Sequence, residues 1–268
     1  MNRKYKIIFT YLIIVFIIIL SSIFPEAISG YSPFSISHSG ISSPGANHIF
    51  GTDFLGRDIF SRTLIGGRIS IVVGVVARIG TVFLGLLIGL AAGLSGIILG
   101  KLLNSITEIF LAIPSLLLAM GLAVSIGEGY NTIIIAIVVG TWAPVARFVS
   151  VQVFEISNYP YINSAKVIGA GRLRIIVKYI MPALFPLLVP ILTTGIATSI
   201  MLESTLSFLG LAGTGLESIP SWGIMIQEGS KFIFDAPWII IPPSIILTIL
   251  ILCFNSIGDR LTYNGFNS

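Results

Sequence analysis

Long runs of apolar residues, separated by short polar segments, constrain this chain more than any other feature of its sequence. A helix of about 20 apolar residues is long enough to cross the hydrocarbon core of a bilayer. Of the 268 residues, 55% are hydrophobic and 10% are charged, whereas a soluble domain carries roughly 25% charged residues. The mean hydropathy of +1.01 agrees. The sequence therefore predicts an all-α integral membrane protein.

Counting these runs predicts six transmembrane helices. The first run is barely long enough to span, and its alternative is a cleaved signal peptide. Because no clear A-x-A cleavage site follows it, we expect the span to be retained. The six expected spans cover residues 7–24, 69–95, 106–126, 132–155, 183–206 and 236–254.

The distribution of charge predicts that both ends of the chain lie in the cytoplasm. The net charge of +4 is spread among short loops, as the positive-inside rule expects, and does not indicate a nucleic-acid partner. A loop with Glu217, Glu228 and Asp235 is expected outside. Nine basic residues fall on the inner side and four on the outer side. The inner ones are Arg3, Lys4, Lys6, Lys101, Lys166, Arg172, Arg174, Lys178 and Arg260, and the outer ones are Arg57, Arg62, Arg68 and Lys231.

The longest polar interruption in the later part of the chain, residues 161–182, predicts two short amphipathic helices. Pro160 is suited to the first turn of a helix, and Gly169 and Gly171 predict a corner after it. The first helix is expected to bury Tyr161, Ala165 and Ile168, and Pro182 is expected to end the second. The apolar face expected for the second helix consists of Leu173, Ile176, Val177 and Ile180. Together the two helices predict a lever lying along the membrane surface.

A second polar stretch, residues 50–70, predicts an amphipathic helix on the outer surface. Asp53 and Arg57, and likewise Asp58 and Arg62, stand four residues apart, which is the spacing of a helical ion pair. We expect these charges to be solvated.

Both stretches resemble motifs of a known transporter family. Asn163, Ser164 and Ala165, then Gly169 and residues 180–182, are similar to the EAA motif of ABC importer permeases, with Asn163 in place of the usual acid. The sequence GTDFLGRDIFSR at residues 51–62 resembles the entry signature of the C-type permease of dipeptide, oligopeptide and nickel importers. Residues 108–119, 204–213, 221–223 and 255–261 resemble further family segments in the same order.

The resemblance implies a permease subunit of an ATP-driven ABC importer with the type-1 permease fold, forming half of a translocation pore. Its expected partners are a second homologous permease in a heterodimer, two cytoplasmic ATPases and an extracytoplasmic substrate-binding protein in the cell (inner) membrane. A cytoplasmic coupling helix would receive the ATPase motion. The expected coupling residues are Tyr161, Asn163, Ser164, Ala165, Lys166, Gly169, Ala170 and Arg172.

The chain then divides into four parts. We expect a transmembrane helix at residues 1–24, an extracytoplasmic segment with an amphipathic helix at 25–68, a permease core at 69–261 with its coupling region at 157–182, and a cytoplasmic tail at 262–268.

Within the spans, Gly85, Gly89 and Gly93 predict close packing of two helices. Charged residues and a proline at membrane depth are candidates for structural or gating roles. Arg78 would cost about 2.5–3.5 kcal/mol in lipid and should therefore face protein or water. Arg147 would either snorkel to the cytoplasmic surface or form a gating ion pair. The candidates are Arg78, Glu108, Pro114, Arg147 and Glu203.

The sequence predicts no enzyme, metal or nucleotide site in this chain. A phosphate-binding loop is excluded because Ser95 and Leu102 replace residues that the motif requires around Lys101. ATP and Mg²⁺ are therefore expected on the partner ATPase. The alternative function is a secondary transporter driven by an ion gradient, for which only Glu108 and Glu203 offer intramembrane acids. The cargo, the residues lining the pore and the direction of transport cannot be read from the sequence.

Overall fold

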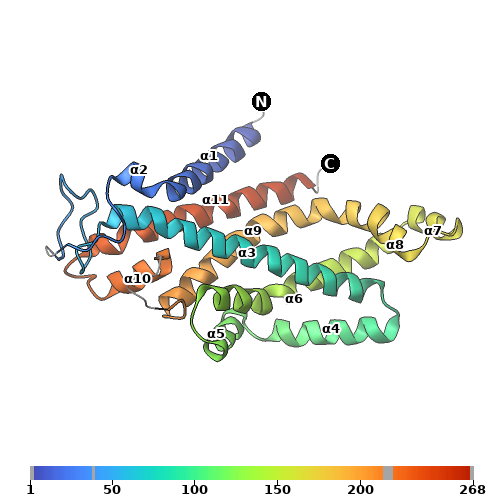
Figure 1. The fold of residues 1–268 in the computed structure, drawn as a ribbon. Helices are drawn as coiled ribbons and strands as arrows, with labels where there is room; N and C mark the ends of the chain where they lie inside the picture. The colour runs from blue at the N-terminus through green and yellow to red at the C-terminus, as the bar shows by residue number, and fades with distance from the viewer. Residues whose placement is uncertain (1–2, 38–39, 214–219, 266–268) are drawn as a thin grey trace.

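The computed structural model describes residues 3–37, 40–213 and 220–265, and this part of the chain is helical apart from its loops (Figure 1). Within these ranges no β-strand forms, and one isolated bridge joins Thr52 to Asp58. Glu217 of the predicted outer loop, and the last three residues of the predicted tail, lie outside the described residues. The all-α prediction is confirmed.

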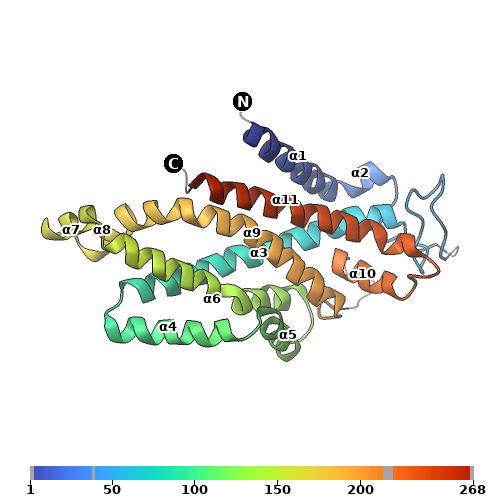
Figure 2. The ribbon, with the colours of Figure 1, turned by 180° about the vertical axis from the view of Figure 1, so that it is seen from behind.

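Long helices run side by side along an elongated bundle (Figure 1). α3 (Ile59–Leu94) packs most extensively against α6 (Tyr130–Ser157), and α9 (Met181–Phe208) packs against α3 and α11 (Ile241–Gly265). α3 lies in front of α6 and α9 in Figure 1 and behind them in Figure 2. α1 (Arg3–Ile23) lies against α3 and α11. The shorter elements are α2 (Pro25–Ser29), α7 (Pro160–Val167), α8 (Arg172–Ile175), α10 (Trp222–Ser230) and a 3₁₀ turn at Pro237–Ile239.

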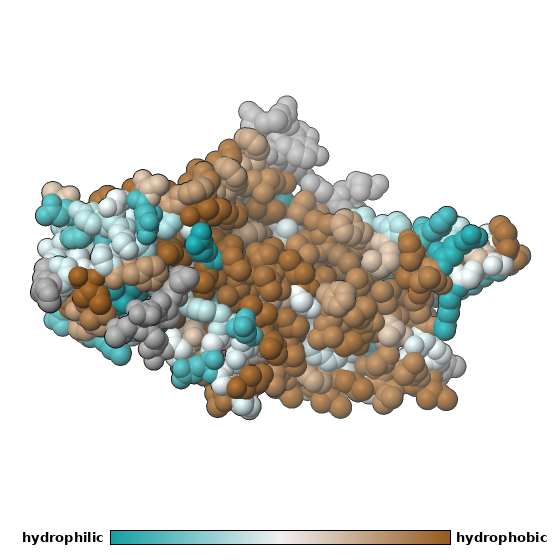
Figure 3. Space-filling view, in the orientation of Figure 1, coloured by the Kyte–Doolittle hydropathy of each residue, from teal (hydrophilic) through white to brown (hydrophobic). Residues whose placement is uncertain are grey.

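Four helices of the described residues are long and apolar enough to cross a membrane, and a bent pair makes a fifth span if its two halves are taken together. The apolar part of α1, Ile7–Ile23, is shorter than these. On the face drawn in Figure 3, the middle of the bundle is apolar and polar side chains gather at its two ends. The count of six spans remains a prediction.

The bent pair is the expected third span, and it departs most from the prediction. α4 (Ile97–Ala112) and α5 (Ser115–Ile126) meet at 89°. Pro114 has no N–H and disfavours helical backbone at Ile113, which is extended (φ −96°, ψ 128°). The proline therefore divides the expected span into two helices. Lys101 and Asn104, which fall in the loop expected between the second and third spans (69–95 and 106–126), lie inside α4.

The glycine repeat of α3 packs as predicted. A Cβ on Gly85 would lie 2.7 Å from the Val145 Cβ, and one on Gly89 would lie 2.6 Å from the Val149 Cβ. Gly93 lies against Val153 in the same way. Because these glycines carry no side chain, the valines of α6 seat directly on the backbone of α3.

Pro182 does not end a helix, contrary to the prediction. A π-helical turn at Ile176–Ile180 joins α8 to α9, and the Met181 N–H donates to the Ile176 carbonyl five residues earlier. Pro182 follows in the first turn of α9. The widened turn accommodates a residue that cannot donate, so the helix continues from Arg172 to Phe208 and is long and apolar enough for one span.

Candidate functional site

The region predicted to receive ATPase motion forms one end of the bundle (Figure 1). Ile162 of α7 is buried in an apolar cluster with Val153 and Ile156 of α6, and Ala165 of α7 is also buried. Around this anchor the Tyr161 ring lies 5.7 Å from Tyr159 and 6.3 Å from Tyr179, between ring centroids. α7 is therefore held on the end of α6 by its own side chains.

The other face of this region is open. Asn163, Ser164 and Lys166 are exposed, and the Lys166 ammonium donates to the Ser157 carbonyl at 3.4 Å. Large apolar side chains also project here: Val167 is 88% exposed, Ile168 is 86% exposed and Leu173 is 75% exposed. Exposed apolar residues flanked by basic ones are typical of a surface that another protein covers.

The buried faces of the two short helices are only partly those predicted, since Ala165 and Ile180 are buried as expected. In α7 Ile162 takes the place expected of Tyr161 and Ile168, because the helix ends at Val167 and leaves Ile168 in the turn. After the turn, Ile175 and Ile180 are buried, whereas Leu173 and Val177 are exposed. The π-helical turn explains the second difference, since it places residues five apart on one face.

The corner between α7 and α8 depends on one glycine. Gly169 has φ +87°, in the left-handed region, whereas Gly171 has φ −64° and ψ 156°, an ordinary extended conformation before α8. Ala170 is half-buried in the same apolar cluster as Ile162. Just beyond it, the Arg172 guanidinium donates to the Leu94 carbonyl at 2.9 Å and so fastens α8 to the end of α3.

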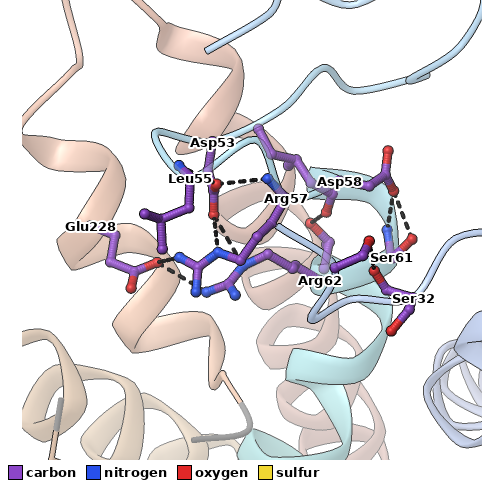
Figure 4. Close-up of polar contacts among 11 residues, drawn as sticks. Ser32, Asp53, Leu55, Arg57, Asp58, Ser61, Arg62 and Glu228 are labelled. Atoms are coloured by element: carbon purple, nitrogen blue, oxygen red, sulfur yellow. Dashed lines mark hydrogen bonds and ion pairs between the residues drawn. The ribbon is translucent and has the colours of Figure 1, made fainter. Parts of the chain in front are cut away.

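A buried ion network, drawn in Figure 4, lies at the opposite end of the bundle, where α3 begins and α10 lies (Figure 1). The Arg57 Nε donates to the Asp53 Oδ2 at 2.7 Å, and Arg62 Nε lies 3.5 Å from the same oxygen. Both arginines also donate to Glu228 Oε2 on α10, at 3.2 Å from Arg57 and 3.0 Å from Arg62. Two carboxylates thus balance two guanidiniums, and the network ties the start of α3 to α10.

Only the second part of the stretch predicted as an amphipathic helix, residues 59–70, is helical, as the start of α3. The charges expected to be solvated are buried, because they pair within this network or cap α3. α3 begins at Ile59, and the residues before it form a loop, so the Asp53–Arg57 pair forms in a turn. The predicted Asp58–Arg62 pair does not form. Asp58 caps α3 instead, accepting from the Ser61 N–H and hydroxyl at 2.7 Å and contacting His48 Nδ1 at 2.8 Å. A cap uses the same carboxylate that a helical ion pair would need.

The candidates for structural or gating roles occupy different places. Glu108 on α4 and Arg147 on α6 form an ion pair at 3.7 Å between exposed side chains, so Arg147 has a partner and is also accessible. Pro114 stands at the break between α4 and α5. Glu203 is fully buried and hydrogen-bonds with Ser70, Ser204, Ser207 and Ser221.

Arg78 lies apart from all of these, halfway along α3. It is 8% exposed and donates from Nη2 to the Ile191 carbonyl of α9 at 2.5 Å. The predicted requirement that it face protein or water is met. The five candidates are therefore not brought together into one site.

Comparison with known proteins identifies the chain. Residues 85–264, most of its length, match the family of binding-protein-dependent transport system inner membrane components. The chain belongs to this family. It is an ABC importer permease of the cell membrane, and it is not an enzyme.

Similar proteins cover nearly all of this permease. It is 36% identical over 251 residues to the dipeptide transport system permease protein DppC of Bacillus subtilis, covering 91% of this chain and 78% of that one. It is 35% identical over 261 residues to the oligopeptide transport system permease protein OppC of the same organism, covering 97% and 85%. It is 34% identical over 257 residues to the glutathione transport system permease protein GsiD of Escherichia coli, covering 94% and 82%.

Sequence reasoning missed two contacts that organise this permease. Glu228 was expected in an acidic outer loop, whereas it lies on α10 and joins both arginines of the ion network. Trp222 is fully buried, donates from its indole N–H to the Thr63 carbonyl at 2.8 Å and covers Gly67. Only its place in a family-like S-W-G segment singled it out, and no local pattern shows a contact over such a sequence distance.

Proposed function

We propose that this permease is one of two membrane subunits of an ATP-driven importer of peptides. The named relatives above are permeases for dipeptides, oligopeptides and glutathione, which supports a peptide cargo over nickel or a metal chelate. No nucleotide-binding motif occurs in the sequence. ATP and Mg²⁺ are accordingly bound by two separate cytoplasmic ATPases, and a second homologous permease completes the pore.

The observation that carries this proposal is the surface formed by α7, the following turn and α8. One face is anchored by Ile162 and Ala165, while Val167, Ile168 and Leu173 project from the other. A mobile loop would absorb a push, but a short helix seated on the end of α6 passes it on. These features support the role of α7 as a coupling helix that docks on an ATPase.

Motion received there has a direct route into the membrane. α8 continues through the π-helical turn into α9, and Arg172 joins α8 to the last turn of α3. When ATP closes the two ATPases, displacement of α7 would move the inner ends of α3 and α9 together. Repetition of this movement in both permeases alternates the access of the pore between the two sides of the membrane.

This arrangement also assigns the two ends of the bundle. We place the coupling end in the cytoplasm, together with both termini, and the ion network outside. The extracytoplasmic binding protein would then deliver peptide at the end where residues 40–58 and α10 lie. The buried network keeps that end rigid, because its charges are held by each other and by the backbone of Leu55 and Arg57.

Two measurements test the proposal. The tagged chain is extracted gently from its native membrane, and the proteins that remain attached are identified by mass spectrometry. A second permease and an ATPase are expected, whereas a homo-oligomer without a nucleotide-binding partner, reproduced after crosslinking, would contradict it. Uptake by the reconstituted complex should require ATP and a peptide. Uptake driven by an imposed ion gradient would favour the secondary transporter, and ATP-driven uptake of nickel alone would change the cargo.

A further inference from the structure

A cavity lies about halfway along the bundle, away from the coupling region and the ion network. Its volume is about 330 Å³, which is within the range of small-molecule sites. Helices α3, α5, α6 and α9 all contribute to its wall. The residues that line it include Arg78, Ser115, Thr141, Pro144, Thr194 and Thr198.

Arg78 gives this cavity an unbalanced positive charge. Its Nη2 is committed to the Ile191 carbonyl, but its Nε has no hydrogen-bond partner among the described residues. None of the described residues that line the cavity is acidic. The Nε itself is fully buried against Gly195, so its N–H is unsatisfied, and the guanidinium carries its charge at the cavity wall without a balancing acid among the described lining residues. A buried guanidinium is normally matched by acceptors, and an acceptor carrying negative charge matches it best.

The fold makes room for this arginine. Gly195 of α9 stands opposite, and a Cβ at that position would overlap the Nε and Cζ atoms of Arg78. The guanidinium can reach the cavity because α9 has a glycine there. The cation is therefore built into the contact between α3 and α9, where both helices also connect to the coupling region.

The threonine hydroxyl groups in the cavity wall offer hydrogen-bond acceptors, whereas Arg78 offers donors. Thr141 donates to the Ile137 carbonyl, Thr194 to the Pro190 carbonyl and Thr198 to the Thr194 carbonyl, at 2.6, 3.0 and 3.3 Å. Because these hydroxyl hydrogens are used within the helices, the oxygens of Thr194 and Thr198 are left as acceptors, whereas the Thr141 oxygen already accepts from the Thr81 hydroxyl at 2.9 Å. The cavity thus combines a forked donor with acceptors, which complements a group that has a carboxylate beside N–H bonds.

We propose that this cavity binds the C-terminal carboxylate of a peptide as it crosses the membrane, with Arg78 as its ligand. The inference rests on the proposed function, which supplies peptides to the pore. Arginine holds a carboxylate through two parallel N–H bonds, and the threonine oxygens accept from the adjoining peptide N–H groups. The site would give the permease its own preference for free peptides, separate from that of the binding protein.

The test compares trialanine with trialaninamide, both radiolabelled, in the complete reconstituted importer. Arg78→Gln should lower the uptake of trialanine about tenfold relative to the wild type, since one charged hydrogen-bonded contact is lost. Uptake of trialaninamide by Arg78→Gln should change little. Trialanine uptake by Arg78→Lys should fall between that of the wild type and that of Arg78→Gln. The binding protein is the same in every sample, so its selectivity cancels in each variant-to-wild-type ratio.

Several results would overturn the proposal. Equal losses for both peptides, together with loss of the second permease from the purified complex, would mean that Arg78 pairs with a carboxylate of the partner subunit. If Arg78→Gln lowers the uptake of neither peptide, Arg78 does not bind the peptide during transport. If Arg78→Gln does not assemble, equilibrium dialysis of the wild-type complex without binding protein decides: trialanine should bind and trialaninamide should not, and equal binding would contradict the site. Absence of any ATP-driven trialanine uptake by the wild type would instead count against the proposed function.

Discussion

The guanidinium of Arg78 on α3 occupies the space that a side chain on Gly195 of α9 would need. The two residues therefore form one structural unit, in which the absence of a side chain on one helix determines where the charge of the other can lie. This relationship makes the position of Arg78 testable without altering the arginine itself.

Gly195→Ala should push the guanidinium out of the cavity. The overlapping atoms are at the flexible end of Arg78, so the helices can stay in place while the bond to the Ile191 carbonyl breaks. We expect a loss of about 1–3 kcal/mol in stability and reduced uptake of trialanine with uptake of its amide retained. Gly121→Ala in α5 is the matched control, because nothing lies within 4 Å of its Cβ position. Unchanged trialanine uptake by Gly195→Ala would contradict the claim that Gly195 holds open the space for the Arg78 guanidinium.

The buried ion network should be sensitive to the loss of one charge. Asp53→Asn leaves Arg57 and Arg62 with Glu228 as their remaining carboxylate, and removing one partner of a buried ion pair typically costs about 3–5 kcal/mol. A large fall in the midpoint of thermal unfolding in detergent is expected. Asp235→Asn, an exposed acid beyond α10, should leave the midpoint unchanged. Equal midpoints for the two variants would show that the network does not stabilise this end.

The contribution of Trp222 to stability should depend on the hydrogen bond from its indole N–H. Trp222→Phe keeps an aromatic ring but loses the bond to the Thr63 carbonyl, and we expect a loss of about 0.5–1.5 kcal/mol in stability. Trp238 is the control, because its buried indole N–H has no partner among the described residues. Trp238→Phe should be neutral or slightly stabilising. The comparison is made by thermal unfolding of the same detergent-purified complex. A greater loss of stability for Trp238→Phe than for Trp222→Phe would show that the hydrogen bond of Trp222 is not what stabilises this region.

Patterns that repeat along one helix predicted the fold well. The apolar runs gave the helices, and the Gly85, Gly89 and Gly93 spacing gave the contact between α3 and α6, because helical periodicity fixes which residues share a face. The proline positions were less informative. Pro114 breaks a span and Pro182 does not, and the difference lies in the backbone of the preceding turn.

Contacts between distant segments were not predictable in the same way. Asp53 and Arg62 were each assigned a partner four residues away, whereas Glu228 on α10 contributes to their network across the fold. Likewise, Arg78 was expected to face protein or water, but nothing in the sequence indicated that Gly195 would receive it. Local spacing cannot show which helix packs opposite, so these parts of the site required the structure.

The coupling region provides the most direct test of the proposed function, because its two glycines differ in backbone conformation. Gly169 has φ +87° with open space around its Cβ position, so Gly169→Val adds roughly 1–2 kcal/mol of strain without a clash. The corner should then change its angle, and peptide uptake per ATP hydrolysed should fall while the complex stays assembled. Gly171→Val is the control, since its extended backbone suits valine and its surroundings are also open. Undiminished uptake by Gly169→Val, or an equal loss in both variants, would show that the corner does not transmit the motion of the ATPase.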